Sequence, residues 1–258
     1  MTLKITHNAS THHVDNTVDA IIVQEHVATH IWCHGNNSRL TIHIEPHAQA
    51  FLYCLNNVDV AEHQVDIHVG KDATISLFEF GLGHECTKRR TAISLKHRGA
   101  TAHYFALDAL MSTAVKHSDL TIFHQSPHTH STQAFRGLYT DKASAHFLGK
   151  VVIEQCAEQS TAHQLYRSII LSDDAQASVM PHLEIYNHDI KASHGATIGE
   201  LDYETLFYLC SRGIPEKTAK GLLLHTMVND IVDNIKNPGL QEKLMALCAD
   251  SIENMVGQ

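Results

Sequence analysis

The sequence predicts a mainly β protein, a β-solenoid followed by an α-helical segment. Two observations lead to this prediction. Short runs of alternating apolar and polar residues are separated by turns that carry alanine at a recurring place, and a helical pattern flanked by breakers replaces them near residue 201. Alternation turns one side of each strand inward, and stacked coils can then share one continuous core.

The strand pattern is clearest in runs such as Leu40 to Ile44 and Val65 to Val69. The turn alanines Ala48, Ala73 and Ala100 follow at intervals of 25 and 27 residues. Small residues at a fixed place let the backbone bend tightly, which favours a solenoid. A β-sandwich with irregular hairpins is the alternative architecture, and the scarcity of Asn-Gly and Asp-Gly turns argues against it.

Capping and breaking residues divide the last part of the chain into three predicted helices. The first begins after Asp202 and ends at Arg212 and Gly213, the second runs from Pro215 to Ile235, and the third from Leu240 to Met255. Asp is a good N-cap, and Gly and Pro end or open helices. We therefore expect a β-helix core domain over residues 1–200 and a C-terminal helical domain over residues 201–258.

Composition limits the class of protein. The 258 residues carry a formal charge of −9, with 19 Lys and Arg against 28 Asp and Glu, so nucleic acid and an anionic membrane are unlikely partners. No run of about 20 apolar residues is present, and we expect a soluble, cytoplasmic protein. The six cysteines form no CxxC pair, so most should be small buried side chains.

The segment from Pro181 to Ile214 is the most informative one. Leu183 and Ile185 alternate with polar residues as in a half-buried strand, and a polar cluster around His194 and Gly195 then precedes the first predicted helix. From the residues alone, this cluster is typical of a short polar turn.

At these residues the sequence resembles the SufB/SufD family, the scaffold proteins of the SUF iron–sulfur cluster assembly system. The resemblance rests on PHLEIYNHDIKASHGATIGELD followed by LFYLCSRGI, and on the block from Thr129 to Ala175 that precedes them. Gly195 follows His194 where SufB-like members tend to have glutamate, so the chain is more similar to SufD. It resembles a SufD-like protein that lacks much of the usual N-terminal region.

The resemblance implies a right-handed parallel β-helix and a non-catalytic scaffold that pairs with a SufB-like subunit and docks a SufC-like ABC-type ATPase. It also implies no permanently bound cofactor and a transient iron–sulfur cluster at the subunit interface, with His194 as one ligand. The residues expected at partner interfaces are Ser193, Gly195, Phe207, Tyr208 and Arg212. Isolated chains are expected to form a homodimer through the exposed strand edge.

The histidines support a second hypothesis. His26, His30 and His34 are spaced four apart in a strand-like context, where a solvated strand face is expected. His124, His128 and His130 could form a compact metal cluster, although a cupin-like site would need a nearby glutamate. In the family, this segment resembles an HxSPxTxS strand with a structural role. The alternative is therefore a metal-binding β-solenoid enzyme, or a homo-oligomeric binding protein, that uses these clusters. Neither a phosphate-binding loop nor a nucleophile elbow is present.

Overall fold

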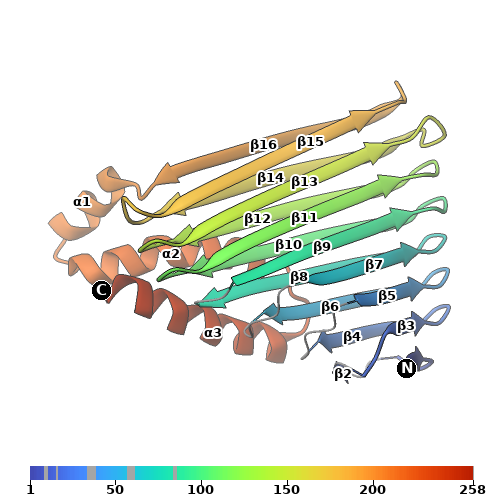
Figure 1. Ribbon diagram of the computed structural model, residues 1–258, viewed down its shortest axis with the longest axis horizontal. Coiled ribbons are helices and arrows are strands. Elements are labelled where there is room, and N and C mark those ends of the chain that lie inside the picture. Colours follow the sequence, from blue (N-terminus) through green and yellow to red (C-terminus); the bar gives the residue numbers. More distant parts are fainter. Residues whose placement is uncertain (9–10, 16, 34–38, 57–61, 84–85, 258) are drawn as a thin grey trace.

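The computed structural model describes residues 1–258 except 9–10, 16, 34–38, 57–61, 84–85 and 258. Within these ranges the chain forms two eight-stranded parallel sheets, followed by three helices (Figure 1). Successive strands alternate between the sheets, so we name them the odd sheet and the even sheet. The odd sheet contains β1 Thr2–Ile5, β3 Ala20–Val23, β5 Arg39–Ile44, β7 His63–Val69, β9 Cys86–Leu95, β11 Val115–His124, β13 Ser144–Ile153 and β15 Gln176–Ile185. The even sheet contains β2 Thr11–Val14, β4 Ala28–Cys33, β6 Gln49–Asn56, β8 Thr74–Gly83, β10 Thr101–Leu110, β12 His130–Tyr139, β14 Ser160–Ile170 and β16 Ile190–Glu200.

This arrangement confirms the predicted parallel β-helix with helices at its C-terminal end. Each strand pairs in parallel with the strand two positions along the chain, as in the pairing of β10 with β8 and β12. A sandwich built from hairpins is wrong, because hairpin-connected strands would pair antiparallel with their immediate neighbours in sequence.

The turn alanines have the role that their period predicted. Ala48, Ala73 and Ala100 are all buried, with at most 1% of their surface exposed. Each follows a residue in the left-handed region, His47, Asp72 or Gly99. The turns also stack, because the His47 backbone N–H donates to the Lys71 carbonyl and the Asp72 N–H donates to the Arg98 carbonyl. Small side chains are therefore required where one coil bends tightly against the next.

Three helices follow the strands, α1 Tyr203–Ser211, α2 Glu216–Val232 and α3 Pro238–Val256. Helices α2 and α3 pack on the outer face of the even sheet, and α1 packs on α2 beyond the end of β16 (Figure 1). The Asp202 side chain caps α1 as expected, at 3.1 Å from the backbone nitrogens of Glu204 and Thr205. The second helix ends at Val232 rather than at Ile235, which is nevertheless buried.

Two apolar clusters hold these layers together. One fills the inside of the solenoid, and the other joins the helices to an aromatic stack on the outside of the even sheet. In that stack the rings of Tyr53, Phe78 and Phe105 follow one another with centroids 5.1 Å apart. Because the helices share this cluster with the strands, the division into domains at residue 200 stays a prediction. Within the described ranges, none of the helices has the length and apolar character needed to cross a bilayer.

Candidate functional site at the open end of the solenoid

The last coil, formed by β15 and β16, has no further coil of the described chain stacked on it. Residues paired in adjacent parallel strands face the same side of a sheet, so the register with β13 and β14 identifies the inward positions of this coil. These are Ala177, Val179, Pro181, Leu183, Ile185, Ile190, Ala192, His194, Ala196 and Ile198. All are partly or fully exposed, although nine of the ten are apolar. The solenoid therefore ends in an unfinished apolar layer, which we call the open end.

His194 is the polar member of this layer. It lies opposite Gln164 in the register of β14 and β16, and Gln164 is 3% exposed whereas His194 is exposed. The Gln164 amide nitrogen donates to the Gly149 carbonyl at 2.9 Å and to Gln133 Oε1 at 3.1 Å. A fixed, hydrogen-bonded layer thus lies directly beneath the imidazole.

The predicted polar turn around His194 is wrong. Residues 190–200 form a strand, because their backbone pairs with β14 from Ser160 to Ile170. The pairing supplies hydrogen bonds that local polarity does not reveal. His194 therefore occupies the middle of an edge strand, where its position is fixed by sheet geometry.

Ser193 and Gly195 lie on the opposite face of β16. Ser193 Oγ is hydrogen-bonded to His163 Nδ1 at 2.7 Å, and both residues are exposed. Gly195 is half-buried beside Leu165, which is 42% exposed. These two predicted interface residues belong to the outer surface of the even sheet, whereas His194 belongs to the open end.

The other predicted interface residues lie on and just after α1. Phe207 is 75% exposed and Tyr208 is 56% exposed, and the guanidinium carbon of Arg212 lies 5.1 Å from the centre of the Tyr208 ring. Tyr203, at the start of the same helix, is 63% exposed. Exposed aromatic side chains with a neighbouring arginine have the composition of protein–protein interface centres.

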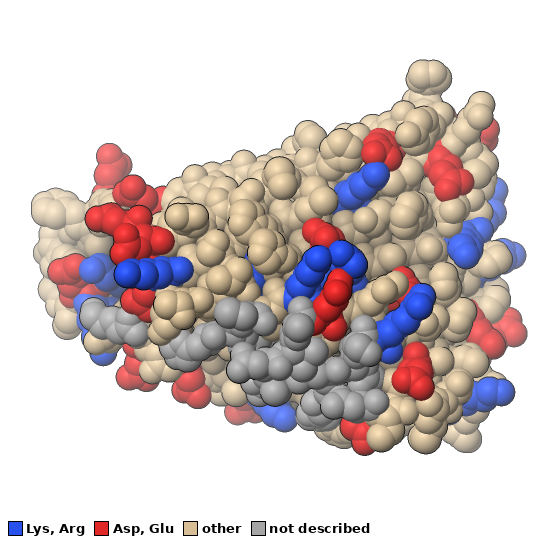
Figure 2. All heavy atoms as spheres, in the orientation of Figure 1, with Lys and Arg blue, Asp and Glu red and all other residues tan. Residues whose placement is uncertain are grey.

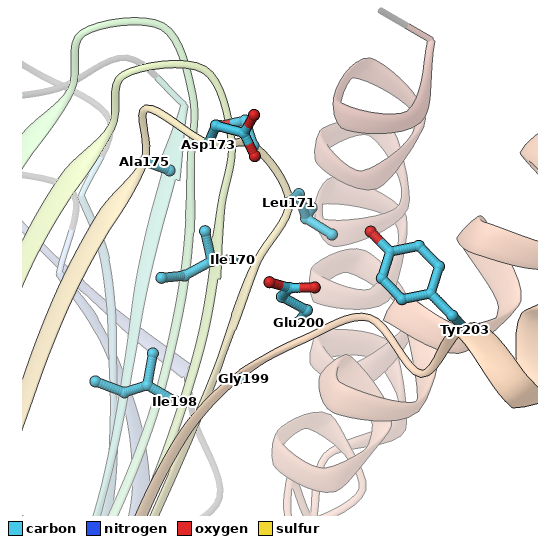
Figure 3. Close-up of a pocket in the computed structure, with 9 residues that line it drawn as sticks. Ile170, Leu171, Asp173, Ala175, Ile198, Gly199, Glu200 and Tyr203 are labelled. Atoms are coloured by element: carbon cyan, nitrogen blue, oxygen red, sulfur yellow. The ribbon is translucent and has the colours of Figure 1, made fainter.

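A hollow of about 440 Å³ lies between the turn that joins β14 to β15 and the segment that joins β16 to α1. Figure 3 shows Leu171 and Asp173 from the turn after β14, together with Glu200 at the end of β16 and Tyr203 at the start of α1. Ile170 and Ile198 supply an apolar wall. The link itself is anchored beside this recess by Leu201, which is buried in the apolar cluster of the helices.

One ion pair ties the helices to the solenoid. Arg136 on β12 is 5% exposed, and its Nε donates to Asp230 Oδ2 on α2 at 2.9 Å. Its Nη1 donates to the carbonyls of Phe135 and Leu165 at 2.9 and 3.1 Å. The arginine thus links α2 to β12 and β14.

Charged side chains inside the solenoid were not anticipated from the sequence. Arg89 Nε lies 2.7 Å from Glu79 Oε1, and the Tyr104 hydroxyl donates to Glu79 Oε2 at 2.8 Å. Asp108 and Lys116 form a second buried pair. Burial raises the pKa of Asp108, although Lys116 opposes this. Charged residues at inward positions of an alternating strand, such as Glu79 between Phe78 and Phe80, are the signal that could have revealed them.

The histidine clusters are not assembled as metal sites. His124 is fully buried, and its two ring nitrogens are each 2.8 Å from a hydroxyl, that of Thr129 or that of Ser131. His26 lies in a turn before β4, and His30 stacks on Phe51, so the expected shared strand face is wrong for these two; His34 lies outside the described residues. In the part of the chain that the structure describes, no three His, Cys, Asp or Glu side chains converge as metal ligands.

Charge is unevenly distributed over the face shown in Figure 2. Acidic side chains gather at the helical end, and charged side chains are sparse over the last strands. Depletion of charge is typical of the core of an interface. The fold and this surface define a parallel β-solenoid with an open, apolar end and a helical segment that carries exposed aromatic residues.

Comparison with known proteins identifies the family of this chain. Residues 3–227 match the model for the SUF system FeS cluster assembly SufBD core domain. The chain therefore belongs to the SufBD family of iron–sulfur cluster assembly proteins, and it is SufD-like. It is 26% identical to the iron–sulfur cluster assembly protein SufD of Escherichia coli over 91% of its own length and 57% of the relative's.

Two further relatives carry the family name. A SufBD family protein of Synechocystis is 31% identical over 68% of this chain and 39% of its own length. Another, from Mycobacterium tuberculosis, is 30% identical over 77% of this chain and 51% of its own. The chain thus spans between about two fifths and three fifths of the length of these relatives.

Proposed function

We propose that this protein is a non-catalytic scaffold subunit for iron–sulfur cluster assembly, which pairs with a SufB-like subunit in the cytoplasm and docks a SufC-like ABC-type ATPase. The open end is the observation that supports this proposal most strongly. Nine apolar residues and His194 occupy inward positions, yet they remain exposed. A subunit that continued the two sheets would bury this layer and pair the free edges of β15 and β16.

His194 is the proposed cluster ligand of this chain. Imidazole is a suitable ligand for iron, and cysteine thiolates are the usual ligands of iron–sulfur clusters. The partner would supply the thiolates, because the exposed inward positions around His194 are apolar. In this role the cluster is cargo that forms transiently between subunits, and the scaffold needs no permanent cofactor.

The helical segment is the proposed docking site of the ATPase. Phe207 and Tyr208 supply exposed aromatic area, and Arg212 supplies a cation beside it. Closure of the ATPase would pull on the helices, and the Arg136–Asp230 pair would carry that movement into β12 and β14. The isolated chain would use the same strand edges to form a homodimer.

Co-expression with SufB-like and SufC-like subunits tests the proposal. Affinity purification through a tag on this chain should recover both partners. Ile198→Asp, at the open end, should release the SufB-like subunit and retain the ATPase, whereas Phe207→Asp should do the reverse. The assignment of the two surfaces would be contradicted if both variants lost both partners, or if both variants kept both partners.

The ligand role is tested in the assembled complex. His194→Ala should reduce cluster formation, measured by visible absorption and bound iron, while leaving the complex intact. His182→Ala is the matched control, because His182 is an exposed histidine on β15 beside Glu184. Equal cluster content in the His194 variant and the control would overturn the ligand role without affecting the pairing.

A further inference from the structure

Two cysteines lie side by side inside the first coils of the solenoid. Cys33 ends β4 and Cys54 lies directly opposite it on β6. Adjacent strands are about 4.8 Å apart, which lies within the range of about 4.4–6.8 Å that a disulfide requires between its Cα atoms. Each thiol shifts the pKa of the other, that of Cys33 upward and that of Cys54 downward. The backbone therefore places this pair at a spacing from which a bond can form.

A buried arginine distinguishes the two sulfurs. The hydrogen bond from Cys33 and the nearby Arg89 guanidinium lower the pKa of the Cys54 thiol, against the effect of burial. The pKa of Cys33 is raised by the same hydrogen bond and by burial. Arg89 is held in place by Glu79, which lies opposite Cys54 on β8. The Cys54 sulfur therefore has the stronger tendency to become a thiolate.

Exposure to solvent favours the other cysteine, Cys33. Cys33 is partly exposed, whereas Cys54 is 4% exposed. Cys33 is therefore the more accessible of the two to a small reagent from solution. Cys33 can thus receive an external group, and Cys54 can then attack the Cys33 sulfur from within the core.

We propose that Cys33 and Cys54 form a redox-active dithiol that a small-molecule disulfide, such as oxidised glutathione, converts reversibly to an intramolecular disulfide. Exchange begins at Cys33 because it is the more accessible sulfur, although its pKa is the higher of the two: after losing its proton, Cys33 displaces one glutathione thiolate and forms a mixed disulfide. The Cys54 thiolate then attacks Cys33 Sγ and displaces the second glutathione thiolate. In net, two cysteine S–H bonds and one glutathione S–S bond break. One protein S–S bond and two glutathione S–H bonds form, so two electrons and two protons leave the dithiol.

This site is independent of the proposed scaffold function, because β4 and β6 lie near the amino-terminal end of the even sheet and β16 is at the other end. The test uses the purified full chain, oxidised glutathione and tryptic peptide mapping without reductant. Arg39 separates the two cysteines, so trypsin places them in peptides 5–39 and 40–71. The expected product is a covalent pair of these peptides, which excess reduced glutathione separates again.

Single variants make the mechanism falsifiable. Cys54→Ser should trap glutathione on Cys33, and Cys33→Ser should leave Cys54 unmodified. Cys156 is exposed and should carry glutathione in every variant, which proves that the oxidant acted. Unlinked peptides from wild-type protein whose Cys156 is modified would overturn the proposal, as would glutathione on Cys54 of the folded Cys33→Ser variant.

Discussion

Replacing His124 with leucine should weaken the fold at neutral pH and make its stability less sensitive to acid. The ring is fully buried and makes one hydrogen bond to Thr129 and one to Ser131, each 2.8 Å long. At a net value of about 1 kcal/mol for each hydrogen bond, the variant should lose about 2 kcal/mol of unfolding free energy at pH 7. Thr129 keeps the Ser160 hydroxyl at 2.7 Å as a partner, so Ser131 is the group left unpaired.

The acid response follows from linkage. Burial, and secondarily the neighbouring His130, lowers the pKa of His124 from 6.5 to about 4. When the pH falls between these two pKa values, the unfolded chain binds a proton at His124 and the folded chain does not. The free energy of unfolding therefore falls. The wild type should lose about 2 kcal/mol between pH 7 and pH 5 through this residue alone. The leucine variant lacks this loss, so the difference between the two proteins should nearly vanish at pH 5.

Urea unfolding followed by circular dichroism at pH 7, 6 and 5 measures both effects. His182→Leu is the control, because the His182 ring is exposed and lies outside the core. A difference between wild type and the His124 variant that stays the same from pH 7 to pH 5 would refute the linkage argument. A variant as stable as wild type at pH 7 would refute the hydrogen-bond argument.

The remaining predictions concern backbone conformation and buried charge. Gly99→Ala should destabilise the protein by about 1–2 kcal/mol, because Gly99 has φ +73° and a Cβ there would lie 2.0 Å from Asp72 Oδ1. Gly221→Ala in α2, where a Cβ meets open space, should stabilise the protein by up to about 1 kcal/mol. The two glycine variants should therefore shift the melting temperature in opposite directions, and shifts of the same sign would contradict this reasoning. Lys116→Met should cost about 3–5 kcal/mol because it leaves Asp108 buried without its cation. Adding Asp108→Leu should recover most of that loss in denaturant unfolding, and a double variant no more stable than the single one would count against the pairing.

Much of the fold could be predicted because its signals are local. Alternation within the strands and alanine at a recurring place in the turns are both properties of short segments, and Ala48, Ala73 and Ala100 are buried where the period places them. The helix boundaries follow from Asp202, Pro215 and Pro238, whose effects depend on the backbone of their own segment. These features needed no knowledge of distant residues.

The features that were missed depend on contacts between coils. Polar residues from Ile190 to Glu200 look like a turn until β14 supplies their backbone partners. Glu79 and Arg89 tolerate burial because they face each other across the inside of the solenoid. Cys33 and Cys54 are unremarkable in the sequence and become a pair only through the register of β4 and β6. Lateral register between coils is the information that a single sequence does not display.

The geometry of a solenoid also explains why the proposed ligand lies in the middle of a strand. Inward positions below the last coil are closed by the coil stacked on them, as Gln164 is closed by the coil that contains His194. The helices pack sideways on β8, β10 and β12, and the last inward layer remains exposed. Under the proposed pairing, a partner strand would lie about 4.8 Å beyond β16, and its side chains would meet His194 inside a largely apolar layer. A cluster formed there would be shielded from water on the side of this chain, which a ligand in an exposed turn could not provide.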